Sequence, residues 1–498
     1  MRVSLVAHVT GIVVRVFGLM FLAPLAVALF YRELSDAAAF ATACIVTTLA
    51  GHAMRHAGGK AAEEAVESMR RVEGLAVVSA AWMLIALFAG IPYLWNGLSF
   101  IDATFEAMSG LTTTGATVFR DFSLYGRSVF FWRSLTNWLG GMGVIALFVA
   151  VLPRLAIGGR EIFFAEASGP DDEKVAPQIR RTAALLWRLY AALTVLQIIA
   201  LVMTGMPLFD SVCNTFGTIA AAGFSPHPLS ISGYQNPAAE WVIIVFMFLA
   251  GANFALQYRA LMRRDWRTFA NDDELRAYVG VVVLATIALA MAIRQTDDSG
   301  ILRTALFQVL SILTTTGFAS VDFNLWNDQA KAVLLGLMFI GGCAGSAGGG
   351  PKVVRHVLLA RFTLQELRRT LHPRAILPVK LGGRVVPAHI MQGVIVFFLF
   401  YMLTFAVCSA IVILLGADLV TGISATAATL GNVGPGFNQV GPMAHFADLH
   451  PISRIVLTFA MWVGRLEVIT VLVILRPEAW RAGRWSSAGA GDSPSLQR

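Results

Sequence analysis

Apolar residues occur along this chain in runs long enough to cross a lipid bilayer. Residues 393–415 and 455–475 each reach the length of about 20 mostly apolar residues that a transmembrane helix needs, and 241–256 reaches it with its flanks. Such runs predict ten spans, at residues 3–30, 37–54, 74–95, 129–152, 183–205, 239–258, 277–294, 332–350, 389–415 and 453–475. The pattern therefore predicts an all-α, polytopic membrane protein.

The composition agrees with this fold class. Of 498 residues, 57% are hydrophobic and only 14% are charged, whereas a soluble domain has about 25% charged residues. A soluble or disordered chain is therefore not expected. The cysteines are scattered, without a CxxC motif or a Cys/His cluster, which indicates neither disulfides nor a metal site; they are Cys44, Cys213, Cys343 and Cys408.

The basic residues predict the orientation. Eight Lys and Arg lie between residues 352 and 384 and four lie in 259–267, whereas 206–258 and 416–453 have none. By the positive-inside rule the basic loops are cytoplasmic, which places both termini inside and is consistent with ten spans. Because the basic residues lie between spans, the net charge of +8 does not indicate a nucleic-acid partner. We expect the Ser/Gly/Ala-rich tail, 483–498, to be disordered.

An internal repeat is the most informative feature of the chain. Four segments align without gaps: 103–118 (ATFEAMSGLTTTGATV), 211–226 (SVCNTFGTIAAAGFSP), 305–320 (ALFQVLSILTTTGFAS) and 422–437 (GISATAATLGNVGPGF). The thirteenth residue of each is glycine: Gly115, Gly223, Gly317 and Gly434. A residue of a helix-capping type precedes each segment: Asp102, Asp210, Thr304 and Thr421. We expect each to cap a helix of about nine residues, too short to span a bilayer.

These four units predict a pore. Each lies between two spans, so one repeat is a span, a short helix, a loop and a second span. Four repeats around an axis enclose a cavity, where irregular backbone is tolerated at membrane depth. Backbone carbonyls there can replace the hydration shell of a cation, and the C-terminal ends of the short helices favour positive charge. The glycine loops contain no acidic residue, which favours carbonyl ligands over a ring of carboxylates.

The repeat divides the chain into six parts. Two transmembrane helices come before the first repeat, and four pore repeats and the tail follow. The expected bounds are 1–71 for the two helices, 72–180, 181–272, 273–384 and 385–482 for the repeats, and 483–498 for the cytoplasmic tail.

The repeats, GGCAGSAGGGPK at 341–352 and GRLE at 464–467 together resemble the Trk-type potassium uptake proteins, the TrkH/TrkG branch of the Trk/Ktr/HKT superfamily. The resemblance covers residues 1–480 and implies gated, selective K⁺ uptake across the bacterial inner membrane. It also implies a homodimer and a cytosolic nucleotide-binding partner of the TrkA type; this chain itself has no GxGxxG motif on a βαβ unit. K⁺ is the transported ion, and no prosthetic group is implied.

The resemblance also implies which residues hold K⁺. The expected ligands are the backbone oxygens of Thr113, Thr114, Gly115, Ala221, Ala222, Gly223, Thr315, Thr316, Gly317, Asn432, Val433 and Gly434. The second loop (AAAGF) and the fourth (NVGPG) lack hydroxyls, so ligation by side chains cannot be fourfold. Gly115 resembles the K⁺-preferring members, whereas plant relatives that favour Na⁺ have Ser at this place.

The glycine-rich segment 341–352 is expected to break the second span of repeat 3. Six glycines followed by Pro351 cannot form a stable helix. The family has an intramembrane gate loop here, and close helix packing through small residues is the alternative. The resemblance implies the gating role for Gly345, Ser346, Gly348, Gly349 and Gly350. Ala347 and Pro351 depart from the family's Thr and Ile, and the effect on gating stays open.

Arg465 lies in the middle of the last span, where a charge is costly and usually faces a cavity or a partner. Glu467 is two residues away and so points elsewhere on a helix. The family places an arginine below its filter as an electrostatic barrier, which implies that role for Arg465. An interhelical salt bridge is the alternative.

Two other functions are alternatives to a selective pore, namely a coupled symporter and an intramembrane enzyme. A proton- or sodium-coupled symporter needs titratable groups on its pathway, and His227 lies just outside the second loop. An enzyme is not expected, because the chain has no HExxH, no GxSxG and no paired intramembrane aspartates.

Four acids are expected either to make the outer mouth negative or to act as caps: Asp121, Glu106, Asp322 and Asp418. Three residues are expected to brace helices by hydrogen bonds: Glu106, Asn137 and Asn253.

Overall fold

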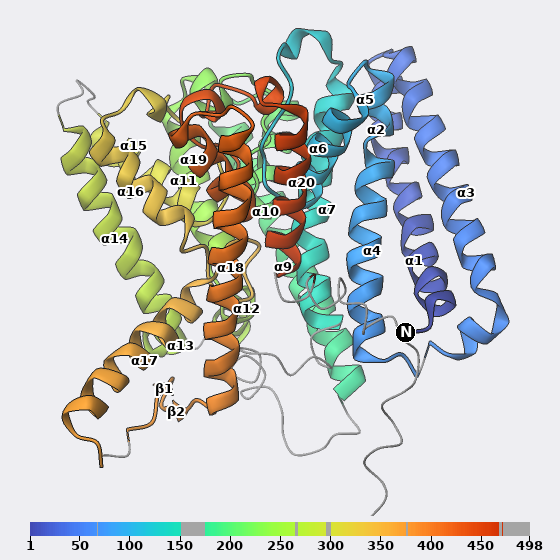
Figure 1. Cartoon of the computed structure of the whole chain (residues 1–498). Helices are drawn as coiled ribbons and strands as arrows, with labels where there is room; N and C mark the ends of the chain where they lie inside the picture. Colours follow the sequence, from blue (N-terminus) through green and yellow to red (C-terminus); the bar gives the residue numbers. More distant parts are fainter. Residues whose placement is uncertain are drawn as a thin grey trace, which may run out of the picture.

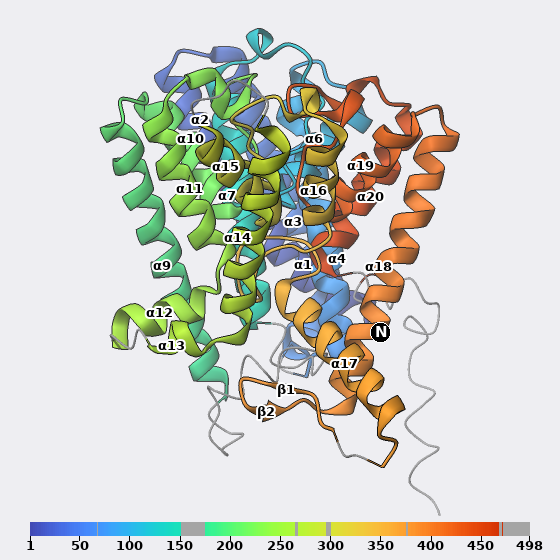
Figure 2. The ribbon, with the colours of Figure 1, turned by 90° about the vertical axis from the view of Figure 1, so that its left-hand side faces the viewer.

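The protein is a bundle of helices that run mostly along one axis, as Figures 1 and 2 show. The structure is a computed structural model and describes residues 1–66, 68–150, 175–263, 267–294, 300–374, 377–467 and 471. We call the two ends of the bundle upper and lower, as they lie in Figure 1. Within the described residues, six helices are long and apolar enough to cross a membrane, and a strongly bent pair makes a seventh span. The chain is thus a multi-pass membrane protein.

The N-terminal helices form a pair at one edge of the bundle (Figure 1). Helix α1 (Val3–Gly18), a short 3₁₀ turn (Leu19–Phe21) and α2 (Leu22–Phe30) make one span, which packs against α3 (Leu34–Glu64). Glycine allows the close crossing, because a Cβ on Gly11 would lie 2.6 Å from the backbone nitrogen of Arg55.

Four groups of helices follow in the order that the repeat predicts. The first is α4 (Arg71–Ala89), α5 (Ile91–Trp95), α6 (Phe100–Leu111) and α7 (Arg127–Ala150). The second is α9 (Val175–Met203), α10 (Leu208–Ala220), α11 (Pro237–Gly251), α12 (Phe254–Arg263) and α13 (Arg267–Asn271). The third is α14 (Asp273–Ile293), α15 (Ile301–Leu313), α16 (Asp328–Met338) and α17 (Val353–Leu371), then the hairpin β1 (Lys380–Leu381) and β2 (Arg384–Val385). The fourth is α18 (Ala388–Leu414), α19 (Leu419–Leu430) and α20 (Pro451–Leu466).

The four groups share buried side chains. One cluster joins the N-terminal pair to repeats 1 and 4, and a second joins repeats 2, 3 and 4. Ion pairs also cross between repeats: among them, Arg454 of α20 bonds Asp102 of α6, and Arg303 of α15 bonds Glu240 of α11 at 2.8 Å. The repeats therefore pack as one bundle.

The four short helices lie in the upper half of the bundle and the hairpin projects at the lower end (Figures 1 and 2). They are α6, α10, α15 and α19, with 12, 13, 13 and 12 residues. The expected caps and lengths were wrong, because the helices begin three or four residues earlier, after Ser99, Pro207, Gly300 and Asp418.

The shift in register has a physical reason. Asp102 lies in the first turn of α6, where its backbone N–H donates to the Ser99 hydroxyl oxygen and its carboxylate accepts from that hydroxyl. In α19 the N–H of Thr421 donates to Asp418 at 3.0 Å. Asp102 and Thr421 are thus hydrogen-bond partners of the capping residues Ser99 and Asp418. They resemble caps in sequence because the cap position and the first turn of a helix favour the same residue types.

The expected span at 239–258 is not one helix. Helix α11 ends at Gly251 and α12 starts at Phe254, with an angle of 101° between them. Asn253 causes the break, since its side-chain oxygen accepts from the N–H groups of Ala255 and Leu256 at 2.8 and 3.1 Å and so caps α12. The expectation that Asn253 braces a pore helix was therefore wrong.

The second span of repeat 3 is interrupted where the glycine-rich segment predicts. Helix α16 ends at Met338, the chain runs on without regular structure, and α17 begins at Val353. The last span, α20, ends at Leu466, and the expected cytoplasmic tail, 483–498, lies outside the described residues.

Candidate functional site

Each short helix is followed by a loop of the same backbone shape. We call these loops 1 to 4, at residues 112–118, 221–226, 314–320 and 431–437. Each has a left-handed residue at the same place in the repeat, an uncommon conformation for side chains other than glycine. The residues and their φ angles are Thr113 (53°), Ala221 (53°), Thr315 (62°) and Asn432 (55°). The internal repeat is thus a repeat of backbone geometry and not only of residue types.

The four loops form a closed ring. Each repeat glycine is so close to the next loop that a Cβ would collide with backbone. On Gly115 it would lie 2.6 Å from the nitrogen of Gly223, on Gly223 2.8 Å from the oxygen of Thr316, and on Gly434 2.5 Å from the oxygen of Thr114. On Gly317 it would overlap the oxygen of Val433. The contacts run from loop 1 to 2, 3, 4 and back to 1, and the twelve residues that the resemblance implies as K⁺ ligands lie in these four loops.

The carbonyl oxygens of Thr114, Thr316 and Val433 lie at the contacts between neighbouring loops. The loops contain no acidic side chain, and the C-terminal end of each short helix leads into the ring. The negative ends of four helix dipoles therefore meet around these carbonyls. Such an arrangement can hold a dehydrated cation through backbone oxygens.

Loops 1 and 3 each contain a hydrogen bond between two threonine hydroxyls of the same loop. The Oγ1 atoms of Thr112 and Thr114 are 2.8 Å apart, and those of Thr314 and Thr316 are 2.7 Å apart. In the same two repeats a serine of the short helix donates to the part of the loop that follows the glycine, which we call its outgoing strand. Ser109 donates to the oxygen of Ala116 and Ser311 to that of Phe318, both at 2.6 Å. These hydroxyls brace the loops from within.

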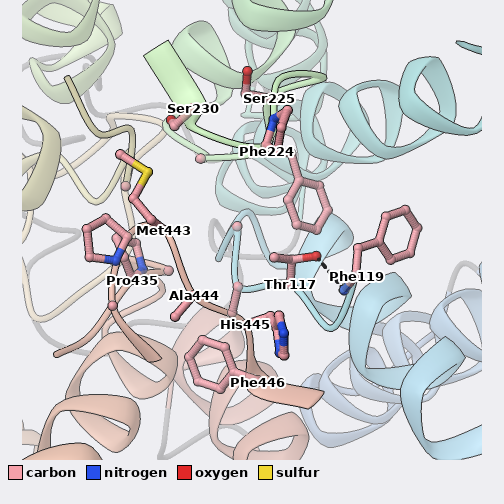
Figure 3. A pocket seen from close by; sticks show the side chains of 18 of the residues that line it. Thr117, Phe119, Phe224, Ser225, Ser230, Pro435, Met443, Ala444, His445 and Phe446 are labelled. Carbon is pink, nitrogen blue, oxygen red and sulfur yellow. Dashed lines mark hydrogen bonds between the residues drawn. The ribbon is translucent and has the colours of Figure 1, made fainter. Parts of the chain in front are cut away.

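A cavity of about 120 Å³ opens above the ring. All four repeat glycines line it, together with the outgoing strands of the loops and the segment 441–446. Figure 3 shows side chains from separate parts of the chain around this mouth, among them Thr117, Phe224, Met443 and His445. The ring is therefore accessible from the upper end.

The four acids do not form one negative patch at this mouth. Asp121, Asp322 and Asp418 cap the starts of short helical turns or of α19, as one of the two expectations had it. Hydrogen bonds from the hydroxyl and N–H of Ser123 hold the pKa of Asp121 below its usual range, so this carboxylate stays ionised at neutral pH. Glu106 is fully buried behind loop 1 and pairs with Arg133, which makes it a brace.

The glycine-rich segment lies directly against loops 3 and 4. The N–H of Gly349 donates to Thr315 Oγ1 at 2.6 Å. A Cβ on Gly348 would lie 2.6 Å from the oxygen of Thr314, and one on Gly349 would lie 2.8 Å from the oxygen of Gly431. Glycine is required at these places because the segment touches the backbone of the ring. We call residues 341–352 the glycine loop.

The glycine loop is also held from the side of repeat 2 and from within. The break between α11 and α12 receives it, since Cys343 N–H donates to Gly251 at 2.8 Å and Gly345 oxygen accepts from Phe254 at 3.1 Å. Ser346 donates to the oxygen of Cys343 at 2.6 Å. Gly345 and Gly350 both have φ of +71°, which favours glycine.

Sequence reasoning missed Glu274, which holds both ends of the glycine loop. Its Oε1 accepts from the N–H of Ala344 at 2.6 Å and from that of Val354 at 3.1 Å. Glu274 is 91% buried at the start of α14. In the sequence it is the last of three consecutive acids before a span. Acids in this position are usually solvent-exposed, so the pattern does not single out Glu274.

Arg465 lies below the ring, and its partners are carbonyls. Its guanidinium donates to the oxygen of Ala347 in the glycine loop at 3.0 Å and to that of Gly140 in α7 at 3.4 Å. In the described part of the chain no carboxylate lies within salt-bridge distance of it, whereas Glu467 pairs with Arg355 at 2.5 Å. A second buried cation that the sequence reading did not single out, Lys352, donates to the oxygen of Gly348.

Comparisons with known proteins agree with this architecture. The family model described as TrkH, cation transport protein, matches residues 37–481. The chain is 36% identical to the Trk system potassium uptake protein TrkH of Salmonella typhimurium and 34% identical to TrkG of Escherichia coli, over 97% of this chain in both cases and over 100% and 99% of the relatives. The crystal structure of the potassium transporter TrkH from Vibrio parahaemolyticus matches with a TM-score of 0.87 at 35% identity, covering 97% of this chain and all of that one.

Proposed function

The chain belongs to the TrkH family of potassium uptake transporters, and from this premise we propose that it conducts K⁺ through the ring of loops 1 to 4. The observation that carries the proposal is the closed ring of four glycines, each against the backbone of the next loop. A ring that leaves no room for a Cβ brings backbone oxygens of four repeats around one axis. Loops 1 to 4 are then a selectivity filter.

In this filter the K⁺ ligands are backbone oxygens. They come from the left-handed residue and the two residues after it in each repeat, ending at Gly115, Gly223, Gly317 and Gly434. The filter residues of loops 2 and 4 have no hydroxyl, so side chains cannot surround the ion from all four repeats, whereas backbone oxygens can replace its water. The mouth cavity of Figure 3 leads hydrated ions to this ring.

We propose the glycine loop and Arg465 as the gate. The loop contacts the filter from below through Gly348 and Gly349. Arg465 donates to Ala347, so the positive charge and the loop are joined and would have to move together. A guanidinium below a cation filter raises the energy of an ion that passes it. Opening therefore requires that the loop leave the filter and take Arg465 with it.

The lower end carries the features of a docking site for a cytosolic partner. Along α17, three exposed leucines lie on one side, Leu364, Leu367 and Leu371, and the neighbouring Arg368 and Arg369 are exposed as well. Because α17 begins where the glycine loop ends, a partner bound to it can pull on the gate. We propose a nucleotide-binding subunit of the TrkA type as this partner, a homodimer as the assembly, and the bacterial inner membrane with both termini cytoplasmic as the location.

The experiment that tests K⁺ conduction is uptake of Rb⁺ into proteoliposomes that hold the purified chain. It is competed with K⁺ or Na⁺, with and without a pH gradient, and with or without a TrkA-type subunit and nucleotide. The proposal predicts uptake that K⁺ inhibits better than Na⁺ and that does not follow the pH gradient. Uptake that follows the pH gradient would favour a proton-coupled symporter instead, and no uptake in any arm would contradict the proposal.

The gate is tested by replacing residues 345–350 with alanines in the same liposomes. Alanine side chains at Gly348 and Gly349 would push the loop away from loops 3 and 4, so Rb⁺ uptake without a partner should rise. Gly336 in α16 is the matched control, because a Cβ there meets nothing within 4 Å. Basal uptake equal to that of the unchanged chain would show that the loop is not the gate.

A further inference from the structure

A buried ion pair lies behind loop 1 and touches two of the four loops. We propose that Glu106 and Arg133 are a positioning pair that holds loops 1 and 2 at a fixed separation and thereby sets the preference for K⁺ over Na⁺. The inference rests on the proposed function of the ring as a K⁺ filter. Neither residue belongs to the filter, and both act through the loops that they hold.

The carboxylate holds the outgoing strand of loop 1. Glu106 lies on α6 with 0% of its surface exposed, and its Oε1 accepts from Arg133 Nε at 2.8 Å. Its Oε2 accepts from the N–H of Val118 at 2.9 Å, and the Thr117 hydroxyl donates to the carboxylate at 3.1 Å. Thr117 and Val118 come two and three residues after Gly115, the last filter residue of loop 1, so the carboxylate fixes where this loop leaves the ring.

The guanidinium connects this carboxylate to loop 2. Arg133, on α7, is 2% exposed and donates to the oxygen of Ser225 at 3.4 Å. Its charge lies over the ring of Phe224, 4.0 Å from the centroid. In Figure 3 the Phe224 ring extends from loop 2 towards Thr117 of loop 1. Phe224 follows Gly223 directly, so one ion pair spans from the end of loop 1 to the end of loop 2.

The other repeats show how unequal this bracing is. Asn214, Gln308 and Ala425 occupy the place of Glu106 in repeats 2, 3 and 4. Gln308 donates to the Ser320 hydroxyl at 3.2 Å, which is a neutral brace inside loop 3, whereas the Asn214 amide donates to the sulfur of Met206 at 3.7 Å. Ala425 has no polar group.

Loop 4 is braced by other residues, since the Ser424 hydroxyl accepts from the N–H of Phe437 at 2.9 Å and the Asn432 side chain donates to Thr114 Oγ1 of loop 1 at 3.0 Å. The bracing of the ring therefore differs from repeat to repeat, although its backbone is fourfold. Among the described residues, Glu106 and Arg133 are the charged brace, and they join loop 1 to loop 2.

This arrangement bears on selectivity for a simple reason. Na⁺ is smaller than K⁺, so carbonyls must move inward to replace its water, whereas a braced loop resists that movement. The carboxylate also cancels the charge of Arg133, which would otherwise repel cations close to the mouth that Arg133 lines. Removing the brace should thus lower the preference for K⁺, and removing the carboxylate alone should also slow uptake.

The test compares four proteins in the Rb⁺ uptake assay: the unchanged chain, E106Q, R133M and the double variant E106Q/R133M. The readout is the ratio of Na⁺ to K⁺ concentrations that halve Rb⁺ uptake, measured on equal amounts of folded protein by size-exclusion chromatography. We expect the ratio to fall by about fivefold in the double variant, the equivalent of one ordinary hydrogen bond. E106Q should also reduce the uptake rate, and the double variant should restore it, because the uncompensated charge is gone.

The matched control is E240Q/R303M, which neutralises the ion pair between the first turns of α11 and α15. It should leave the ratio unchanged. A double variant E106Q/R133M that folds and keeps the ratio of the unchanged chain would overturn the inference. E106Q, which keeps the shape of the side chain, decides the question in the same way where the double variant is not recovered folded. Absence of uptake by the unchanged chain in every arm of the assay, including those with the partner subunit and nucleotide, would instead overturn the proposed function, so the two failures are distinguishable.

Discussion

At the scale of single residues, the four repeat glycines are dictated by contacts between loops that lie far apart in the chain. Gly317 has φ of +78°, and a Cβ there would overlap the oxygen of Val433. Neither condition alone requires glycine as strongly as both together, since another residue would suffer backbone strain as well as a collision. The TTTG motif is therefore a consequence of ring closure.

The substitution G317A tests this explanation. The added methyl group should force loops 3 and 4 apart, and we expect Rb⁺ uptake to fall at least about fivefold, since such overpacking costs about 1–3 kcal/mol. The control is G280A in α14, where a Cβ meets nothing within 4 Å. Uptake by G317A at the rate of G280A, with equal protein in the membrane, would contradict the ring geometry.

Much of the site could be predicted at this scale, and the misses have a common cause. The four glycines, the glycine loop and Arg465 stand out because a polar or flexible residue at membrane depth is unusual for its local surroundings. Glu274 and the pairing of Glu106 with Arg133 do not stand out, because their meaning depends on partners that are distant in sequence. Glu274 bonds Ala344, which is 70 residues away, and no local pattern records such a contact.

At the scale of elements, the glycine loop is held by groups from three neighbours. Glu274 of α14 ties its two ends, the break after α11 receives its first half, and Arg465 of α20 bonds its middle. The sequence indicated that this span is broken, because six glycines and a proline cannot be helical. It did not indicate the break at Asn253, since one asparagine in an apolar run has the same pattern whether it caps a helix or faces a neighbour.

Loss of the Glu274 contacts should release the loop. E274A removes two hydrogen bonds, together about 2 kcal/mol, which would lower the ratio of closed to open loop about thirtyfold. Basal Rb⁺ uptake without a partner subunit should rise accordingly. E274Q keeps an oxygen in the place of Oε1 and should stay close to the unchanged chain.

Asp273, the neighbour of Glu274, supplies the control for this prediction. Its carboxylate bonds Arg361 at 2.9 Å and the N–H of Gly382 at 2.9 Å instead of the glycine loop. D273N should therefore leave basal uptake low. Equal basal uptake in E274A and D273N would show that Glu274 does not hold the gate closed.

Arg465 acts at the same scale, because it joins α20 to the glycine loop and to α7. R465A removes the charge below the filter and two hydrogen bonds to carbonyls. We expect higher uptake at saturating Rb⁺ in liposomes and an unchanged yield of folded protein, since the described partners of Arg465 are carbonyls and its loss leaves no carboxylate unpaired. Normal transport together with loss of folded protein would favour a purely structural role.

At the scale of the whole molecule, the gate and the proposed docking site are parts of one segment. The chain passes from the filter contacts at Gly349 through Lys352 into α17, whose far end carries exposed leucines and arginines at the lower end of the bundle (Figure 2). A partner that moves α17 would thus act on the filter contact directly. This connection was not visible in the sequence, where the basic run is explained equally well by membrane topology.

Replacing the exposed side chains of α17 tests the connection. In a variant with Leu364, Leu367 and Leu371 changed to serine, activation of Rb⁺ uptake by a TrkA-type subunit with nucleotide should be lost, while uptake without the partner stays as it was. These side chains are 56%, 59% and 75% exposed, so the fold should tolerate the change. Full activation of this variant would place the docking site elsewhere.

The central claim is that the four loops hold K⁺ together on one axis, and the most direct measurement is a crystal structure of the protein in Rb⁺ with anomalous scattering. The account predicts Rb⁺ peaks inside the ring, within bonding distance of backbone oxygens from all four loops, including those of Gly115, Gly223, Gly317 and Gly434. Rb⁺ bound only at side chains outside the ring, with the ring empty, would contradict it.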